Sequence, residues 1–166
     1  TPDDLPNDDK AWAVLTPPEK LVVMLVTQNN PVLEKVLEAC PIAKLDTISP
    51  ADFAAIDHNA RDLAAEYAIL VLDNNIPENL PRCDYITFGN VPAQTGIEIS
   101  GISKNQYIVD WRTRHAILKY VNLNNLFVAE AHNMIVPRDG EVLAEFNKTP
   151  AITMIRRNGS TFIVSG

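Results

Sequence analysis

The sequence predicts an α/β fold in which an open, doubly wound sheet continues into antiparallel strands. Two observations support this prediction. Short runs of β-branched and aliphatic residues alternate with helical patterns over the first half of the chain, and parallel strands need such crossover helices on the faces of their sheet. From about Leu126 onward, strand-like runs are instead separated by turn signals, which is typical of antiparallel strands.

The first strand is expected over residues 21–26, because LVVMLV is a continuous apolar run of the kind buried on both faces of a sheet. Asn30 then provides a side-chain oxygen that can cap a helix, and Pro31 suits the first helical position. Apolar residues recur at helical spacing until Pro41. This segment therefore predicts a strand, a tight turn and a helix.

The same pattern then repeats. A second strand over residues 43–48 is followed by the segment 49–52 (SPAD), in which the serine can cap a short helix and the proline takes its first position. The third expected strand, residues 67–73, is the most hydrophobic in the chain, and the fourth, residues 84–88, ends at Gly89.

The antiparallel part is expected in four runs: residues 126–136, 141–146, 151–157 and 161–164. Asn158 and Gly159 form a strong hairpin signal, and the segment 137–140 (PRDG) fits a type I turn. Between the two parts, residues 91–108 are rich in Gly, Ser, Asn and Gln. We expect them to form a long loop at the carboxyl edge of the parallel strands, where open α/β sheets bind ligands.

Length and charge limit the organisation and the partners. With 166 residues, one domain is expected at residues 21–166, truncated at its C-terminus, while residues 1–20 form a linker or the end of a preceding domain. The net charge of -7 repels phosphate backbones and argues against nucleic acid. No apolar run approaches the ~20 residues that span a bilayer, and the first residues lack a signal-peptide pattern. The chain begins at Thr1 and ends directly after a strand-like run, so we expect a piece of a longer protein.

Nucleophilic catalysis is not expected. A cysteine hydrolase or amidotransferase places a thiol at a sharp turn between strand and helix, but the turn after the fourth strand reads Gly89-Asn90. Cys40 and Cys83 fall at the opposite, amino edge. We expect both to be buried or half-buried free thiols, with a disulfide between them as the alternative.

No metal or cofactor is expected either. Asp73 follows an apolar strand, as in response-regulator receivers, but residues 27–30 (TQNN) lack the carboxylates of a Mg²⁺ site, so Asp73 is expected to cap a turn. The three histidines, His58, His115 and His132, share no ligand spacing. The aspartates between residues 3 and 9 lack the pattern of a calcium loop.

The segment 110–115 (DWRTRH) is the candidate binding region. The simplest interpretation is structural: Trp111 packs its loop onto the sheet, its indole N–H needs an acceptor, and residues 116–120 look helical. The alternative is a ligand site formed by Trp111 with the polar side chains of the neighbourhood, namely Asn90, Asp110, Arg114 and His115.

Three stretches carry a resemblance to a known family: residues 4–15 (DLPNDDKAWAVL), residues 30–37 (NPVLEKVL), and residues 110–111 (DW) with 115–123 (HAILKYVNL). They resemble the C-terminal region of bacterial aerotolerance-type (BatA-like) membrane proteins, which carry a von Willebrand factor A domain. The resemblance implies a fold like that of class I glutamine amidotransferases, which is flavodoxin-like, between a β-sandwich and a C-terminal membrane helix.

The resemblance has limits. The family usually has His-Pro where this chain has His115-Ala116, so a role tied to that turn does not transfer, and the metal motif DxSxS of the von Willebrand domain is absent. It implies a non-catalytic, extracytoplasmic scaffold or protein-interaction domain of a membrane-anchored protein, with other proteins of the same membrane complex as partners. The alternative is a ligand-binding or hydrolytic member of the amidotransferase-like superfamily. An enzyme predicts polar groups that converge in a pocket at the carboxyl edge, whereas a scaffold predicts a shallow edge and an exposed apolar patch.

Overall fold

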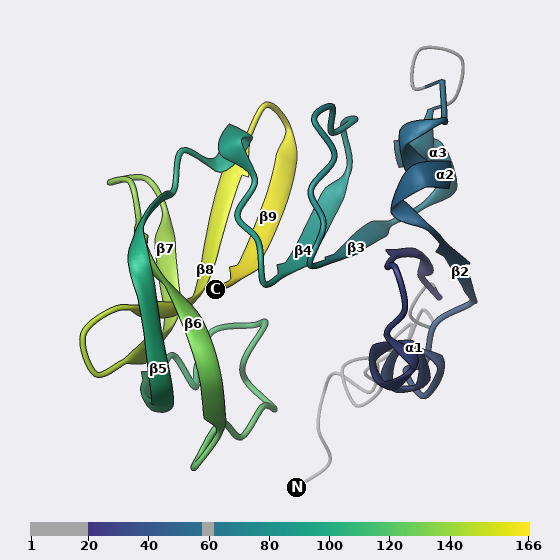
Figure 1. The fold of residues 1–166 in the computed structure, drawn as a ribbon. Coiled ribbons are helices and arrows are strands. Elements are labelled where there is room, and N and C mark those ends of the chain that lie inside the picture. Colours follow the sequence, from purple (N-terminus) through teal and green to yellow (C-terminus); the bar gives the residue numbers. More distant parts are fainter. Residues whose placement is uncertain (1–19, 58–61) are drawn as a thin grey trace, which may run out of the picture.

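A computed structural model describes residues 20–57 and 62–166. Within these ranges, nine strands form one sheet in the order β2-β1-β3-β4-β9-β8-β7-β5-β6, and a few short helices connect them (Figure 1). The predicted α/β class is confirmed. His58 lies outside the described ranges, and so does the expected linker over residues 1–20 except for its last residue.

Four parallel strands form one half of the sheet: β1 (Val22–Val26), β2 (Lys44–Ile48), β3 (Ile69–Asp73) and β4 (Asp84–Phe88). The helices beside them are α1 (Pro31–Glu38), α2 (Pro50–Ala54) and α3 (Leu63–Glu66). All four strands lie where the sequence predicts them. β1 and β3 are almost continuous apolar runs, whereas β2 (KLDTI) and β4 (DYITF) mix polar and apolar residues.

Alternate side chains of the central strand β1 enter two different hydrophobic clusters. Met24 packs on the face that is covered by Phe53 of α2 and by α3. Leu25 packs on the other face, against Leu33 and Leu37 of α1. Because successive strand residues point to opposite faces, helices on both sides are needed to bury a run that is apolar at every position.

The helix starts follow the predicted local chemistry. The Asn30 side-chain oxygen accepts a hydrogen bond from the backbone N–H of Leu33 at 3.0 Å, and Ser49 Oγ accepts one from that of Asp52 at 3.1 Å. Each cap satisfies a backbone donor that has no partner within its own helix.

Five strands form the second half: β5 (Glu98–Trp111), β6 (Phe127–Ile135), β7 (Glu141–Phe146), β8 (Pro150–Arg157) and β9 (Ser160–Ser165). The pairs β5–β6, β5–β7, β7–β8 and β8–β9 are antiparallel. The pairs β7–β8 and β8–β9 join runs that the sequence predicts as antiparallel strands, whereas the two pairs of β5 were not predicted. However, β9 also pairs in parallel with β4, so the C-terminal third is not wholly antiparallel. Its last strand completes the parallel half.

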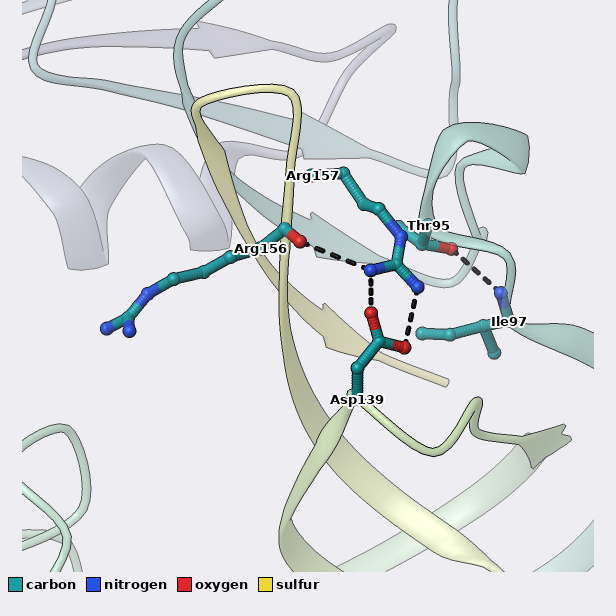
Figure 2. Close-up of polar contacts among 5 residues, drawn as sticks. All are labelled: Thr95, Ile97, Asp139, Arg156 and Arg157. Carbon is teal, nitrogen blue, oxygen red and sulfur yellow. Dashed lines mark hydrogen bonds and ion pairs between the residues drawn. The ribbon is translucent and has the colours of Figure 1, made fainter.

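An ion pair joins the turn of the β8–β9 hairpin, at the upper end of that hairpin in Figure 1, to the turn between β6 and β7. Asn158 and Gly159 both have positive φ, 52° and 78°, which confirms the predicted Asn-Gly hairpin. The segment 137–140 closes with a hydrogen bond from the Gly140 N–H to the Pro137 carbonyl at 2.9 Å. Arg157 holds both carboxylate oxygens of Asp139 and so ties the two turns together (Figure 2). The guanidinium lowers the pKa of Asp139.

The predicted loop over residues 91–108 is wrong. This segment forms the 3-10 helix η1 (Ala93–Thr95) and most of the 14-residue strand β5. Buried Thr95 anchors its start: the hydroxyl donates to the Pro92 carbonyl at 2.6 Å and accepts from the Ile97 N–H at 3.2 Å, the latter drawn in Figure 2. Polar residues occur in β5 because most of its positions are exposed.

The expected helical character of residues 116–120 is also wrong, because the segment between β5 and β6 forms turns held by single hydrogen bonds, such as that from the Leu118 N–H to the His115 carbonyl at 3.0 Å. In the described residues, no helix is long and apolar enough to cross a bilayer.

Both cysteines are free thiols, as predicted, but their environments differ. Cys83 is buried, and its Sγ lies 3.5 Å from the Tyr67 carbonyl oxygen. Burial raises the pKa of the Cys83 thiol to about 11. Cys40 is exposed at the end of α1, which corrects the expectation that it is at least half-buried.

We expect alkylation to separate the two thiols. In the native protein at pH 8, iodoacetamide should modify Cys40 and leave Cys83 unmodified, because Cys83 is buried and its raised pKa leaves very little thiolate. Both should react in urea. Intact-mass measurement of wild type and Cys40→Ser gives the counts; equal native rates for both thiols would contradict the described burial.

Candidate functional site

The carboxyl edge of the parallel strands is closed by hydrogen bonds. Asp73, the last residue of β3, accepts a bond at 2.6 Å from the hydroxyl of Thr27, which follows β1. Both residues are more than nine-tenths buried. The carboxylate therefore links the two central strands and does not simply cap its own turn, as the sequence had suggested.

Asn74 and Gly89 lie beside this bond. Asn74 has a φ of 49°, donates from its side chain to Asp73 at 3.2 Å, and donates from its backbone to the Phe88 carbonyl at 2.9 Å. Gly89 has a φ of 75°, and a Cβ there would stand 2.0 Å from the Asn74 Oδ1. Glycine suits this position for two reasons: its backbone adopts a positive φ without strain, and it has no Cβ to collide with the Asn74 side chain.

His132 of β6 also reaches this edge, which the sequence pattern did not predict. Its Nε2 lies 2.8 Å from the Gly89 carbonyl oxygen, so Nε2 must be the donor. No described residue bonds to its buried Nδ1. Antiparallel and parallel strands thus meet at Gly89, a contact that no local signal could reveal.

The structure brings together four of the five predicted binding residues. Asp110, Trp111, Arg114 and His115 line a shallow cavity of about 530 Å³ with residues 112–113 and Glu141. Asn90, in the turn after β4, is not among the lining residues. Whether these side chains bind a ligand stays a prediction.

Polar groups of this cavity largely bind one another. Arg112 forms an ion pair with Glu141 of β7, and His115 Nε2 lies 3.8 Å from the same carboxylate. The Ile117 N–H donates to His115 Nδ1 at 3.3 Å. His115 therefore caps a turn. Glu141 was missed by sequence reasoning because it is distant in the chain and lies in an ordinary strand pattern.

Trp111 does not pack a loop onto the sheet, as the sequence had suggested, because it is the last residue of strand β5, and it lacks the expected hydrogen bond. Its half-buried ring lies against the cluster of β5, β7 and β8 side chains, while its buried Nε1 has no acceptor among the described residues.

A larger open cavity of about 880 Å³ lies elsewhere, beside the loop that leads into β4. Its lining includes three carboxylates, Asp57, Asp62 and Glu78, and the guanidinium of Arg82. No group of three or more His, Cys, Asp or Glu side chains in the described ranges is placed to hold a metal ion.

Exposed apolar side chains concentrate on β5, β6 and their connection. Ten of the fourteen exposed large hydrophobic residues that the structure describes lie there. We call these ten residues the β5–β6 apolar surface: Ile99, Ile102, Tyr107, Val109, Ile117, Tyr120, Val121, Leu126, Phe127 and Ile135. Tyr107 and Phe127 are opposite each other on the two strands, with ring centroids 5.3 Å apart.

Comparison with known proteins gives the fold alone. No family model matches the sequence, and a search of curated proteins finds no match. Cytoplasmic protein STM3548 from Salmonella typhimurium is similar with a TM-score of 0.62 and 6% identity, over 87% of this chain and 86% of that one. Cytoplasmic protein STM1381 from Salmonella typhimurium LT2 has a TM-score of 0.57 at 12% identity, with the same coverage. A β-galactosidase from Bacillus circulans sp. alkalophilus has a TM-score of 0.50 at 13% identity, over 88% of this chain but 28% of that enzyme.

Replacing Gly89 by alanine should destabilise the domain by about 2–3 kcal/mol, because the backbone strain of a left-handed alanine adds to the loss of the Asn74 contact with Asp73. Gly96→Ala is the matched control: its φ is 70°, but nothing lies within 4 Å of the added Cβ, so about 1 kcal/mol is expected. Urea unfolding measures the free energy of unfolding of both variants. Equal losses would show that displacing the Asn74 side chain does not destabilise the domain.

Trp111→Ala should cost about 2–3 kcal/mol, below the range for a fully buried aromatic, because the ring is half-buried. Trp111→Phe should cost about 1 kcal/mol or less, because it keeps most of the ring contacts and no hydrogen bond is lost. Urea unfolding measures the loss of unfolding free energy in both variants. If Trp111→Phe loses more than half as much as Trp111→Ala, the prediction is wrong and the indole N–H has a hydrogen-bond partner in solution.

Proposed function

We propose that this chain is a non-catalytic protein-interaction domain and that the β5–β6 apolar surface is its contact surface. The observation that supports the proposal is the concentration of exposed hydrophobic side chains on two strands and their connection. Large exposed apolar patches are uncommon on proteins without a partner, because water contact with this area is unfavourable. Two of its aromatic side chains, Tyr107, 55% exposed, and Phe127, 48% exposed, lie opposite each other on β5 and β6.

The carboxyl edge supports the same proposal. At the point between β1 and β3 where open α/β sheets bind ligands, the side chains of Thr27 and Asp73 bind each other. In the turn after β4, the space that a side chain of residue 89 would need is filled by the Asn74 side chain. These groups are engaged in holding strands together and not in a cavity that could accept a substrate.

Ligand binding at the cavity of Asp110, Trp111, Arg114 and His115 is the second candidate. The 530 Å³ volume and the gathering of four predicted residues favour it. It ranks lower because Glu141 already binds Arg112 and faces His115, which leaves Arg114 and Asp110 as the charged groups without a described partner.

The finer fold assignment belongs to the same proposal. The order β2-β1-β3-β4-β9 of the parallel strands corresponds to the flavodoxin-like order 2-1-3-4-5, which supports the amidotransferase-like fold implied by the resemblance to BatA-like proteins. The resemblance adds that the full-length protein is anchored in a membrane by segments outside this chain, with this domain outside the cytoplasm and with proteins of the same complex as partners.

Site-specific photo-crosslinking in the full-length protein, in its native cells, tests the proposed surface. A benzophenone amino acid at Tyr107 should give protein adducts of defined mass, whereas the same group at Val32 should give none above background. Val32 is the matched control because it is apolar, 73% exposed and on α1. Adducts from neither position, or the same adducts from both, would contradict the proposal.

A further inference from the structure

We propose that the cavity at the end of β5 binds a small zwitterion, which is a molecule with one ammonium and one carboxylate group. A free amino acid and a short peptide with free ends both have this chemistry. The proposal rests on the second candidate function, because it names the ligand class for that cavity. The cavity volume of about 530 Å³ lies within the range of small-molecule sites.

The segment that forms the cavity is held in place by its own backbone. The Thr113 N–H donates to the Trp111 carbonyl at 2.9 Å, so the chain turns directly after β5. The His115 N–H donates to the Arg112 carbonyl, also at 2.9 Å. The Arg112 N–H donates to the Leu143 carbonyl of β7 at 2.8 Å. Such a segment has little conformational freedom left to lose when a ligand binds.

Two basic side chains of the cavity already face one carboxylate, that of Glu141. Arg112 forms an ion pair with it, and His115 Nε2 lies 3.8 Å from it. Because His115 Nδ1 accepts a hydrogen bond from the Ile117 N–H at 3.3 Å, the proton of the neutral ring is on Nε2, which faces Glu141. The charges of Arg112 and Glu141 therefore largely cancel each other.

Asp110 and Arg114 are the two charged side chains of the cavity that have no partner among the described residues. They carry opposite charges and line the same cavity, but they do not form an ion pair with each other. Asp110 is also opposite Glu145 on the neighbouring strand β7. Because these two carboxylates repel each other, a cation beside Asp110 is stabilised. An ammonium group at Asp110 and a carboxylate at Arg114 would complement the cavity.

Trp111 gives the cavity an apolar surface. Its half-buried ring lines the cavity, whereas its Nε1 is buried and out of reach of a ligand. A ligand with an apolar side chain can cover part of this ring while its charged groups reach Asp110 and Arg114. A ligand with a single charge would leave one of these two residues unpaired, so the cavity should discriminate against it.

The test follows the indole N–H signal of Trp111 in ¹⁵N-labelled protein, assigned with Trp111→Phe, during titration with L-leucine and with leucyl-leucine to about 20 mM. At least one should give a saturable shift, and the tighter ligand shows whether the source is a free amino acid or a peptide. Its N-acetylated form lacks the ammonium group, and its C-terminal amide lacks the carboxylate. Each should bind at least tenfold more weakly, because one charge of the cavity loses its partner.

Two variants assign the charges to their residues. Arg114→Gln should bind the ligand and its amide equally weakly, because the partner of the carboxylate is gone. Asp110→Asn should bind the ligand and its N-acetylated form equally weakly. Arg156→Gln is the matched control, since Arg156 is an exposed arginine on β8 outside the cavity, and it should bind as wild type does. All three side chains are exposed, and thermal unfolding verifies that each variant is folded.

The outcomes separate this inference from the proposed contact surface. No saturable shift with either ligand, modified forms that bind as tightly as the parent, or an Arg114→Gln variant that binds as wild type does would each overturn the inference. Photo-crosslinking from Tyr107 is read independently of these titrations, so adducts there support the contact surface even where no zwitterion binds. A saturable shift that is weakened in both modified ligands and in both variants supports the inference, even where no protein is captured.

Discussion

The two-sided pairing of β9 is the constraint on which the whole sheet depends. This strand continues the parallel half through β4 and begins the antiparallel half through β8. Its side chains also divide between the hydrophobic clusters: Phe162 and Val164 enter the cluster under α2 and α3, and Ile163 packs against the cluster of the antiparallel strands. Because the last strand serves both halves, the parallel sheet is incomplete until the end of the chain has been added, and neither half can be described as an independent unit.

Features that depend on a few consecutive residues could be predicted from the sequence. Asn30 and Ser49 cap their helices, and Asn158-Gly159 turns the β8–β9 hairpin, because each of these signals acts within three or four residues. Strand β5 was missed for the opposite reason. Its polar residues are tolerated where a strand faces water, so composition made it look like a loop.

Contacts between distant segments could not be predicted from such signals. The bond from Thr27 to Asp73 depends on β1 and β3 being neighbours, and the ion pair of Arg112 with Glu141 depends on β5 and β7 being neighbours. The sequence identified the segment of Asp110 and His115 as a candidate site, but it could not show that β7 would supply a carboxylate to it. It also gave no sign that His132 would reach Gly89.

Gly89 has a consequence for how this fold can change during evolution. Hydrolases of the α/β class carry their nucleophile on a sharp turn after a strand, and Gly89 lies on such a turn after β4 here. Any residue with a Cβ would meet the Asn74 side chain, so serine or cysteine cannot simply replace the glycine. The amide of Asn74 would have to turn away, which would break its bond to Asp73. A single substitution is therefore a poor route to a nucleophile on this turn, whereas exposed strand positions can acquire new contacts one side chain at a time.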